Sequence, residues 1–374
     1  MKRIVLIALV SILTMIEATA QVANGYYRIQ NNASSRYITI RDNVVGELDY
    51  SSTNADLSNI QTWRGFDYVK SNPASVIYVE QVGSFYNLKV QGTSIYEISG
   101  NRRYLGLRTQ TDGTNIMYIE YNGMEYRLYD VISGEDKGSV THKKNDTAYQ
   151  YWKFIPIDTD NNYIGLQPTV QVGDSYYGTL YASYPFKVAS SGITVYYVDG
   201  VKDGAFQLQE ITDEVKPAST PLVFKCSSND PAQNKITPVT DATTPPDNNK
   251  MGGTYFACTI SGHKANVRYD ENTMRVLGKN EAGELAFVTA TKADLYSSHY
   301  IPQNTCWLNV PNGLTGDFKL VSREEFTTGI RNIKSEENNS DANAPIYTLT
   351  GTRANTKALR PGIYIQNGKK KVIK

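Results

Sequence analysis

Apolar and polar residues alternate over short stretches of this chain, and the stretches recur in a similar order. Residues 25–30 and 36–40 alternate in this way on either side of an Asn/Ser-rich turn. An aromatic stretch followed by an Arg-Tyr-aliphatic stretch returns at residues 84–90 and 103–108, and residues 125–131 open a third copy. A period of two is typical of strands with one buried face, so the pattern predicts a β unit present three times.

Alternation continues after residue 158, although the repeat does not. Further strands are predicted at residues 178–186, 193–198, 205–211, 217–225, 253–257 and 285–288. Residues 228–252 are rich in Asp, Asn, Pro and Thr, which favours a long excursion, and residues 292–295 favour a short helical turn. Long stretches with the apolar spacing of an amphipathic helix are missing after residue 20. We therefore predict an all-β protein, in agreement with its 28 tyrosines, since aromatic residues are favoured in strands.

Two Gln-x-Trp triplets close the first and third copies: Gln61-Thr62-Trp63 and Gln150-Tyr151-Trp152. In this respect residues 21–158 resemble the ricin-type β-trefoil, in which each subdomain ends with Gln-x-Trp. The resemblance implies that Trp63 and Trp152 are structural core residues. The middle copy lacks the motif, and Tyr118-Ile119-Glu120 is expected in its place. The predicted architecture is an N-terminal β-trefoil followed by β-sandwich-like modules over residues 159–330.

Resemblance to ricin-type lectins also implies a carbohydrate site. It places the sugar-binding aspartate of such lectins at Thr39 in the first copy and at Gly106 in the second, so both positions depart from the lectin pattern. Asp42 and Asn43 lie close enough for a shifted site that would work together with exposed tyrosines. A glycan is therefore the first ligand expected, and a surface protein the second.

Both ends of the chain resemble export signals. Lys2 and Arg3 precede an apolar run, and small residues at 18–20 suit a signal peptidase, so residues 1–20 are expected to be a signal peptide. Residues 345–374, with Pro361-Gly362-Ile363-Tyr364 and a lysine-rich finish, resemble the C-terminal sorting tail of exported Bacteroidetes proteins. The polar residues 331–344 are predicted to be a flexible linker before this tail, which ends in a short β hairpin. We expect a secreted or cell-surface protein that engages export machinery through both signals.

The middle of the chain resembles a β-rich module common in secreted Bacteroidetes proteins. The resemblance rests on Tyr-Ala-Ser-Tyr-Pro at residues 181–185 and Pro-Ala-Ser-Thr-Pro at residues 217–221. It implies no particular chemistry.

The charge balance, the length of apolar runs and the cysteine content limit the kinds of partner, disulfide and metal site that the chain can have. Lys and Arg number 38 against 37 acidic residues, so the basic field that nucleic acid would need is missing. After residue 20 no apolar run approaches the ~20 residues of a membrane span. Three cysteines (Cys226, Cys258 and Cys306) allow at most one intrachain disulfide, and their spacing does not fit a Cys-x-x-Cys metal site.

Candidate catalytic and metal motifs are incomplete. Gly173-Asp174-Ser175 lacks the continuation of a serine hydrolase and is interpreted as a turn before a strand. Asp158-x-Asp160-x-Asn162 starts like a calcium loop but has Tyr163 where Gly is needed and Thr169 where Glu is needed. The three histidines (His142, His263 and His299) lie in polar or loop surroundings without a companion at metal-ligand spacing. We expect no cofactor, no metal and a non-catalytic binding protein, with a secreted hydrolase or a structural surface component as the alternatives.

Overall fold

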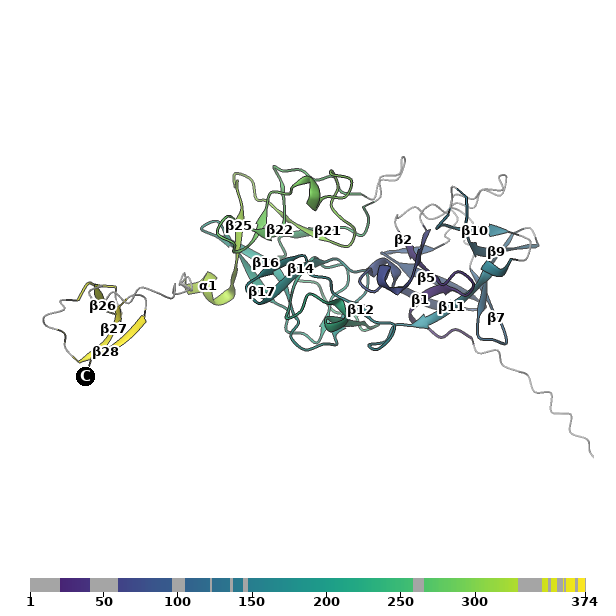
Figure 1. Cartoon of the computed structure of the whole chain (residues 1–374), viewed down its shortest axis with the longest axis horizontal. Helices are drawn as coiled ribbons and strands as arrows, with labels where there is room; N and C mark the ends of the chain where they lie inside the picture. The colour runs from purple at the N-terminus through teal and green to yellow at the C-terminus, as the bar shows by residue number, and fades with distance from the viewer. Residues whose placement is uncertain are drawn as a thin grey trace, which may run out of the picture. The chain divides into compact units, whose positions relative to one another are not determined.

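The computed structural model describes residues 21–40, 60–95, 105–121, 123–134, 137–143, 147–257, 266–328, 345–348, 351–354, 359, 361–366 and 369–373. The chain divides into two compact units, Met1–Val321 and Ser322–Lys374 (Figure 1). Strands dominate the described parts of both units, so the prediction of an all-β protein is confirmed.

The first half of the larger unit, residues 21–158, is an all-β region whose strands are purple to blue in Figure 1. We call it the trefoil-like region, after the resemblance of its sequence. Its strands are β1 (Gly25–Asn31), β2 (Arg36–Ile40), β3 (Ile60–Arg64), β4 (Ile77–Val82), β5 (Phe85–Val90), β6 (Thr93–Ile95), β7 (Gly106–Thr109), β8 (Asn115–Tyr121), β9 (Met124–Asp130), β10 (Val140–Lys143) and β11 (Tyr151–Pro156). The alternating stretches at residues 25–30, 36–40, 84–90 and 125–131 thus form strands close to their predicted bounds.

Strand pairing in this region closes on itself. β1 pairs with β4, β4 with β5, β7 with β8, β8 with β11, and β11 returns to β1. A single bridge between Tyr86 and Leu105 joins β5 to the start of β7, with a 2.8 Å bond from Tyr86 N to Leu105 O. The hairpins β2–β3 and β9–β10 complete the arrangement. Closure removes the exposed edges that an open sheet would leave, and the enclosed side chains form one core around Ile29, Leu88 and Trp152.

The second half of the larger unit, residues 159–321, is a two-sheet module. One sheet has the order β12-β20-β15-β18, and the other has the order β13-β14-β19-β16-β17-β25-β23-β22-β24-β21. The strands are β12 (Ile164–Gly165), β13 (Val170–Val172), β14 (Ser175–Leu180), β15 (Phe186–Val188), β16 (Thr194–Lys202), β17 (Ala205–Glu210), β18 (Val215–Lys216), β19 (Leu222–Cys226), β20 (Lys235–Pro238), β21 (Met251–Gly253), β22 (Met274–Lys279), β23 (Leu285–Val288), β24 (Cys306–Asn309) and β25 (Phe318–Ser322).

Strand β19 is buried on both faces, which explains its continuous apolar sequence. Leu222 and Phe224 point into a core shared with Phe186 of the smaller sheet. Val223, between them, belongs to a second core that contains Phe287 of β23. Because successive side chains of a strand point to opposite faces, one strand supports both cores of the module.

Several predicted boundaries in the module are wrong. The stretch 178–186 is divided between β14 and β15, because residues 181–185 leave the ladder. The predicted excursion 228–252 contains β20, and the strand expected at 253–257 ends at Gly253. The short helical turn expected at 292–295 is present at Lys292–Asp294.

A buried arginine joins the trefoil-like region to the module. Arg28 of β1 donates from Nε to Ser75 Oγ (3.0 Å) and from Nη2 to Val69 O (3.0 Å). Its Nη1 donates to Asn162 Oδ1 at 2.7 Å, at the point where the module begins. Burial lowers the pKa of this guanidinium to about 10. These bonds fix the turn around residues 69–75 against the module.

The smaller unit contains α1 (Arg323–Thr328) and a sheet of β26 (Ile346–Thr348), β27 (Gly362–Gln366) and β28 (Lys369–Ile373). The sheet is antiparallel with the order β26-β27-β28. The strands β27 and β28 form the hairpin expected in the C-terminal tail, and β26 adds a third strand beside it.

Candidate functional site

Of the residues to which the lectin resemblance points, the structure describes the two aspartate positions, Thr39 and Gly106. Asp42 and Asn43 lie outside the described residues. Thr39 is buried on β2. At Gly106 a Cβ atom would lie 2.2 Å from the Tyr118 ring, so that ring occupies the space a side chain would need. The two lectin-aspartate positions are therefore inside the packed structure and closed to a ligand.

The tryptophans of the two Gln-x-Trp triplets lie on β3 and β11. Trp152 of β11 is fully buried in the trefoil-like core, and its Nε1 donates to Leu128 O at 3.0 Å. The backbone of Trp63 pairs with Tyr37, whereas its side chain lies outside the described residues. In the middle copy, Ile119 is buried in the same core.

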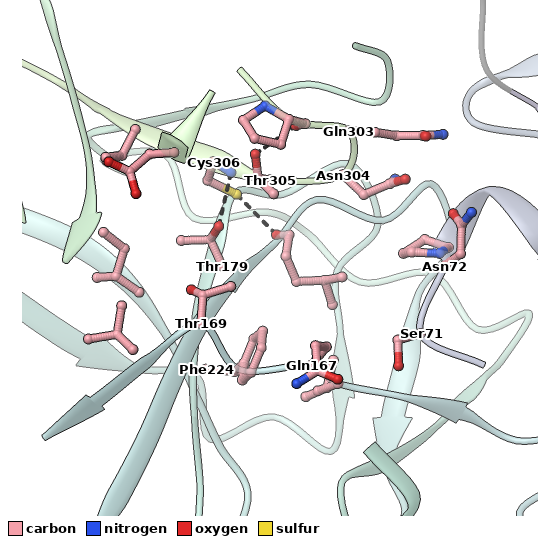
Figure 2. A pocket seen from close by; sticks show the side chains of 18 of the residues that line it. Ser71, Asn72, Gln167, Thr169, Thr179, Phe224, Gln303, Asn304, Thr305 and Cys306 are labelled. Atoms are coloured by element: carbon pink, nitrogen blue, oxygen red, sulfur yellow. Dashed lines mark hydrogen bonds between the residues drawn. The ribbon is translucent and has the colours of Figure 1, made fainter. Parts of the chain in front are cut away.

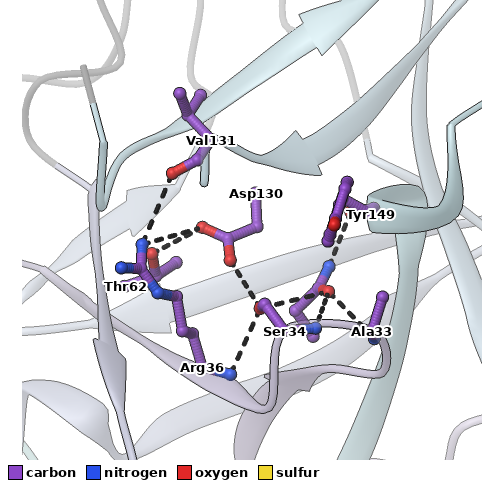
Figure 3. Close-up of polar contacts among 8 residues, drawn as sticks. Ala33, Ser34, Arg36, Thr62, Asp130, Val131 and Tyr149 are labelled. Carbon is purple, nitrogen blue, oxygen red and sulfur yellow. Dashed lines mark hydrogen bonds and ion pairs between the residues drawn. The ribbon is translucent and has the colours of Figure 1, made fainter. Parts of the chain in front are cut away.

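A buried carboxylate in the trefoil-like region was not found from the sequence. Asp130, at the end of β9, is 1% exposed. Its Oδ2 accepts from Ser34 Oγ at 2.5 Å and its Oδ1 from Thr62 Oγ1 at 2.6 Å, while Arg36 Nη1 lies 3.8 Å away (Figure 3). Burial raises the pKa of Asp130, and these hydrogen bonds act in the opposite direction. Since protein groups surround both oxygens, Asp130 connects the first and third copies and does not face a ligand.

The other motifs singled out from the sequence are turns. Gly173 and Asp174 link β13 to β14 in a hairpin in which Val172 pairs with Ser175. Asp158 Oδ1 accepts backbone N–H groups from residues 160, 161 and 162, at 2.9 to 3.1 Å. An oxygen used in this way closes an Asx turn, so the loop serves the chain's own backbone.

Of the described histidine and cysteine side chains, His142, Cys226 and Cys306 are buried and His299 is exposed. His142 lies buried on β10, which corrects the expectation of polar or loop surroundings, and burial lowers its pKa. Cys226 and Cys306 are free thiols, and burial raises the pKa of each to about 12. His263 and Cys258 lie outside the described residues. In the described ranges, His, Cys, Asp and Glu do not gather in groups of three suited to a metal ion.

A cavity of about 740 Å³ lies between the trefoil-like region and the module (Figure 2). Ser71, Asn72 and Pro73 of the trefoil-like region form one wall. Residues 164–167 and 169–171 of the module and the segment 302–306 form others, and Val276 to Lys279 also line the cavity. The volume falls within the range of small-molecule sites, which is roughly 300 to 1,000 Å³.

The lining combines uncharged polar groups with an apolar floor. Leu166, Leu180 and Phe224 belong to the apolar part. The polar side chains labelled in Figure 2 are Ser71, Asn72, Gln167, Thr169, Thr179, Gln303, Asn304 and Thr305. The lining also has one cation, Lys279, and one carboxylate, Asp294, both exposed. Asp294 Oδ2 already accepts from Thr291 N and Oγ1.

Some polar groups of the lining form hydrogen bonds within the protein, and others have a donor or acceptor atom that a ligand could use. Thr179 Oγ1 accepts from Cys306 N at 3.2 Å, and Thr305 Oγ1 donates to Pro302 O at 2.7 Å. Asn72 Oδ1 accepts from Ala74 N at 3.0 Å, which leaves its Nδ2 as a donor. Gln167 uses its Nε2 on two carbonyls, at 3.3 Å each, which leaves its Oε1 as an acceptor. Donors and acceptors are therefore both available at one end of the cavity.

Two groups of the lining, Asp294 and Cys306, have side chains of the kinds used in catalysis. Hydrolysis by two carboxyl groups needs a pair across the cleft, and the lining supplies Asp294 alone. The Cys306 thiol lines the cavity, but a thiol that stays protonated at neutral pH is a poor nucleophile.

Comparisons with known proteins add little to this geometry. No protein-family model matches the sequence, and no curated protein matches it. Among solved structures, a designed 3-fold symmetric protein, ThreeFoil, is similar at 14% identity over 36% of this chain and 99% of its own, with a TM-score of 0.26. No helix in the described parts of the chain has the length and apolar character needed to cross a bilayer.

Proposed function

We propose that this chain is an exported, non-catalytic binding protein whose cavity takes a neutral carbohydrate. One observation carries the proposal, namely that amide and hydroxyl groups line an apolar-floored cavity beside a single cation and a single carboxylate. A sugar ring matches such a site because it has an apolar C–H face and hydroxyls that both donate and accept. Charged ligands match less well, since they would require an excess of one charge.

Affinity for a single sugar is expected to be weak. Few groups are left uncommitted, and each neutral hydrogen bond contributes only about 0.5 to 1.5 kcal/mol. Dissociation constants near the millimolar end, which correspond to about 4 kcal/mol, are therefore expected. Binding to a multivalent surface would then depend on avidity.

Titration of the whole chain with neutral, acidic and amino sugars, followed by NMR or calorimetry, tests the proposal. Thr169→Trp should occupy part of the cavity and weaken binding, whereas Thr212→Trp, at an exposed position outside the lining, should leave it unchanged. Gln167→Ala should weaken binding about 2- to 10-fold, with Gln233→Ala as the matched exposed control.

Two outcomes would redirect the proposal. A site at Asp42 and Asn43 stays a prediction from the sequence, and loss of binding in Asp42→Ala but not in Thr169→Trp would place the ligand there. If no neutral sugar shifts any resonance at millimolar concentration, protein binding or scaffolding becomes the better interpretation.

A further inference from the structure

Two buried amide side chains face each other where the trefoil-like region meets the module. Gln91 follows β5 and is 1% exposed. Its Nε2 donates to Asn304 Oδ1 at 2.9 Å, and Asn304 Nδ2 donates back to Gln91 Oε1 at 3.0 Å. Gln91 Nε2 also donates to Tyr255 O at 2.9 Å. This reciprocal pair is directional, so it is satisfied in one relative position of the two segments.

Asn304 belongs to a wall of the cavity. Its backbone φ is 57°, a left-handed conformation, and its Nδ2 also donates to Tyr181 O at 2.8 Å. Tyr181 N donates to Asn304 O at 2.9 Å, which ties the wall to the module. The neighbour Gln303 donates from Nε2 to Ile40 O at 2.9 Å, a second bond to the trefoil-like region. The segment 302–306 is thus held from both sides.

The trefoil-like region reaches a second wall as well. Ser71, Asn72 and Pro73 line the cavity directly, and Lys70 O accepts from Gly165 N at 2.8 Å. The trefoil-like region therefore contacts the cavity on two sides, through the turn at residues 71–73 and through the bonds to residues 303 and 304. A shift of the trefoil-like region relative to the module would change the distance between the walls at residues 71–73 and 302–306.

We infer that Gln91 is a positioning residue for the cavity: it holds the wall at residues 303–306 at the spacing that the bound sugar requires. This inference rests on the proposed function of the cavity. Gln91 is absent from the lining and acts through Asn304. The trefoil-like region and the module then form one binding unit. The trefoil-like region lines the cavity with its turn at residues 71–73, and through Gln91 it also fixes the position of the opposite wall.

The variant Gln91→Leu tests the inference, because it keeps the size of the side chain and removes all three hydrogen bonds of the Gln91 amide, two to Asn304 and one to Tyr255 O. The probe is whichever neutral sugar binds the wild-type chain most tightly in a panel of glucose, galactose, mannose and N-acetylglucosamine. We expect the dissociation constant, measured on folded protein, to rise by about 2- to 30-fold. Backbone amides of residues 303–306 should also exchange hydrogen faster than in the wild-type chain.

Ser183→Ala is the matched control. Ser183 Oγ accepts from Gln91 N at 3.0 Å, so this change removes a bond between the same two regions without touching residues 303–306. In Ser183→Ala, the dissociation constant of the sugar and the hydrogen exchange of the backbone amides of residues 303–306 should stay unchanged. The reciprocal exchange Gln91→Asn with Asn304→Gln keeps one amide at each position and should restore part of the affinity lost in Gln91→Leu.

The outcomes separate the inference from the proposed function. If the wild-type chain binds none of the sugars, the proposed function fails and the role of Gln91 in binding fails with it. If the wild-type chain binds but Gln91→Leu has the same affinity and the same exchange at residues 303–306, the inference alone is overturned. Equal loss of affinity in Ser183→Ala would also overturn it, since the effect would then come from general loosening.

Discussion

Trp152 shows how one side chain holds the trefoil-like core together. It is fully buried, touches the cluster formed by strands of all three copies, and satisfies its indole N–H on Leu128 O. Its motif was recognisable from the sequence because Gln-x-Trp recurs. Asp130 had no comparable signal, since a carboxylate at the end of a strand normally faces water.

Replacing Trp152 with alanine should lower the free energy of unfolding by ~3 to 5 kcal/mol, because a large cavity replaces a buried indole. Urea denaturation followed by circular dichroism measures this. Tyr68→Ala is the control, since Tyr68 is 62% exposed and should change stability little. Unchanged unfolding in Trp152→Ala would contradict the assignment of this residue to the core.

Asp130 predicts a pH dependence of stability. Burial raises its pKa in the folded state. The folded state thus binds the proton of Asp130 more tightly than the unfolded state does. The resulting stabilisation is fully present below the ordinary aspartate pKa of about 3.9, and it is lost as pH rises through the pKa of Asp130 in the folded state. The stability of the wild-type chain minus that of Asp130→Asn should therefore fall as pH rises from about 3 towards 7.

Asp270→Asn supplies the opposite control for Asp130. Hydrogen bonds from Asn272 N and Thr273 lower the pKa of Asp270, so its contribution is present above about 3.9 and is lost as pH falls. Denaturant titrations at several pH values measure the free energy of unfolding of each variant. The wild-type value minus the variant value should fall with rising pH for Asp130→Asn and rise with pH for Asp270→Asn. The same slope for both would contradict the buried-carboxylate interpretation.

At the scale of elements, the limits of some strands were predictable and those of others were not. Residues 36–40 and 285–288 form β2 and β23 with the predicted limits, although both strands are buried on both faces. The residues of β19 are apolar in succession because both faces are buried, and such a run gives no periodic signal for where the strand begins. Residues 181–185 look like a continuing strand, but their contacts come from distant segments such as Asn304.

The segment around Phe256 is a second element whose role lies outside its own neighbourhood. Phe256 belongs to the module by sequence but is buried in the core of the trefoil-like region. The ring of its neighbour Tyr255 packs against that of Tyr181, with ring centroids 4.5 Å apart, and Tyr255 O accepts a hydrogen bond from Gln91 Nε2. The trefoil-like core is thus completed by a residue about a hundred positions downstream of its last strand.

Phe256→Ala should therefore destabilise the trefoil-like region, although the substitution lies in the module. A cost of ~3 to 5 kcal/mol is expected for a buried phenylalanine. Hydrogen exchange resolved by peptide should locate the loss of protection in the strands of residues 25–31 and 85–90. Tyr296→Ala, at a position 48% exposed in the module, is the matched control. Protection lost in the module alone would contradict this.

At the scale of the whole molecule, the fold class was predictable but the cavity was not. Alternation of polar and apolar residues is a local property, so it can be recognised in the sequence without knowledge of the tertiary structure. The cavity is assembled from residues 71–73, 164–167, 169–171 and 302–306, which no spacing rule connects. Its uncharged amides and hydroxyls also resemble ordinary surface residues. The lectin resemblance instead predicted a site at Asp42 and Asn43, which lie outside the described residues.

Export is the remaining property of the whole molecule, and it is proposed from the terminal residues of the sequence. If Lys2, Arg3 and the following apolar run direct secretion, the mature chain begins at Gln21. Mass spectrometry of protein recovered outside the inner membrane should find that terminus. Ala20→Arg should block cleavage, because the peptidase requires small residues there, whereas Gln30→Ala, well beyond the cleavage point, should not. Recovery of full-length wild-type protein from the cytoplasm would contradict export and remove the reason for expecting an extracellular carbohydrate.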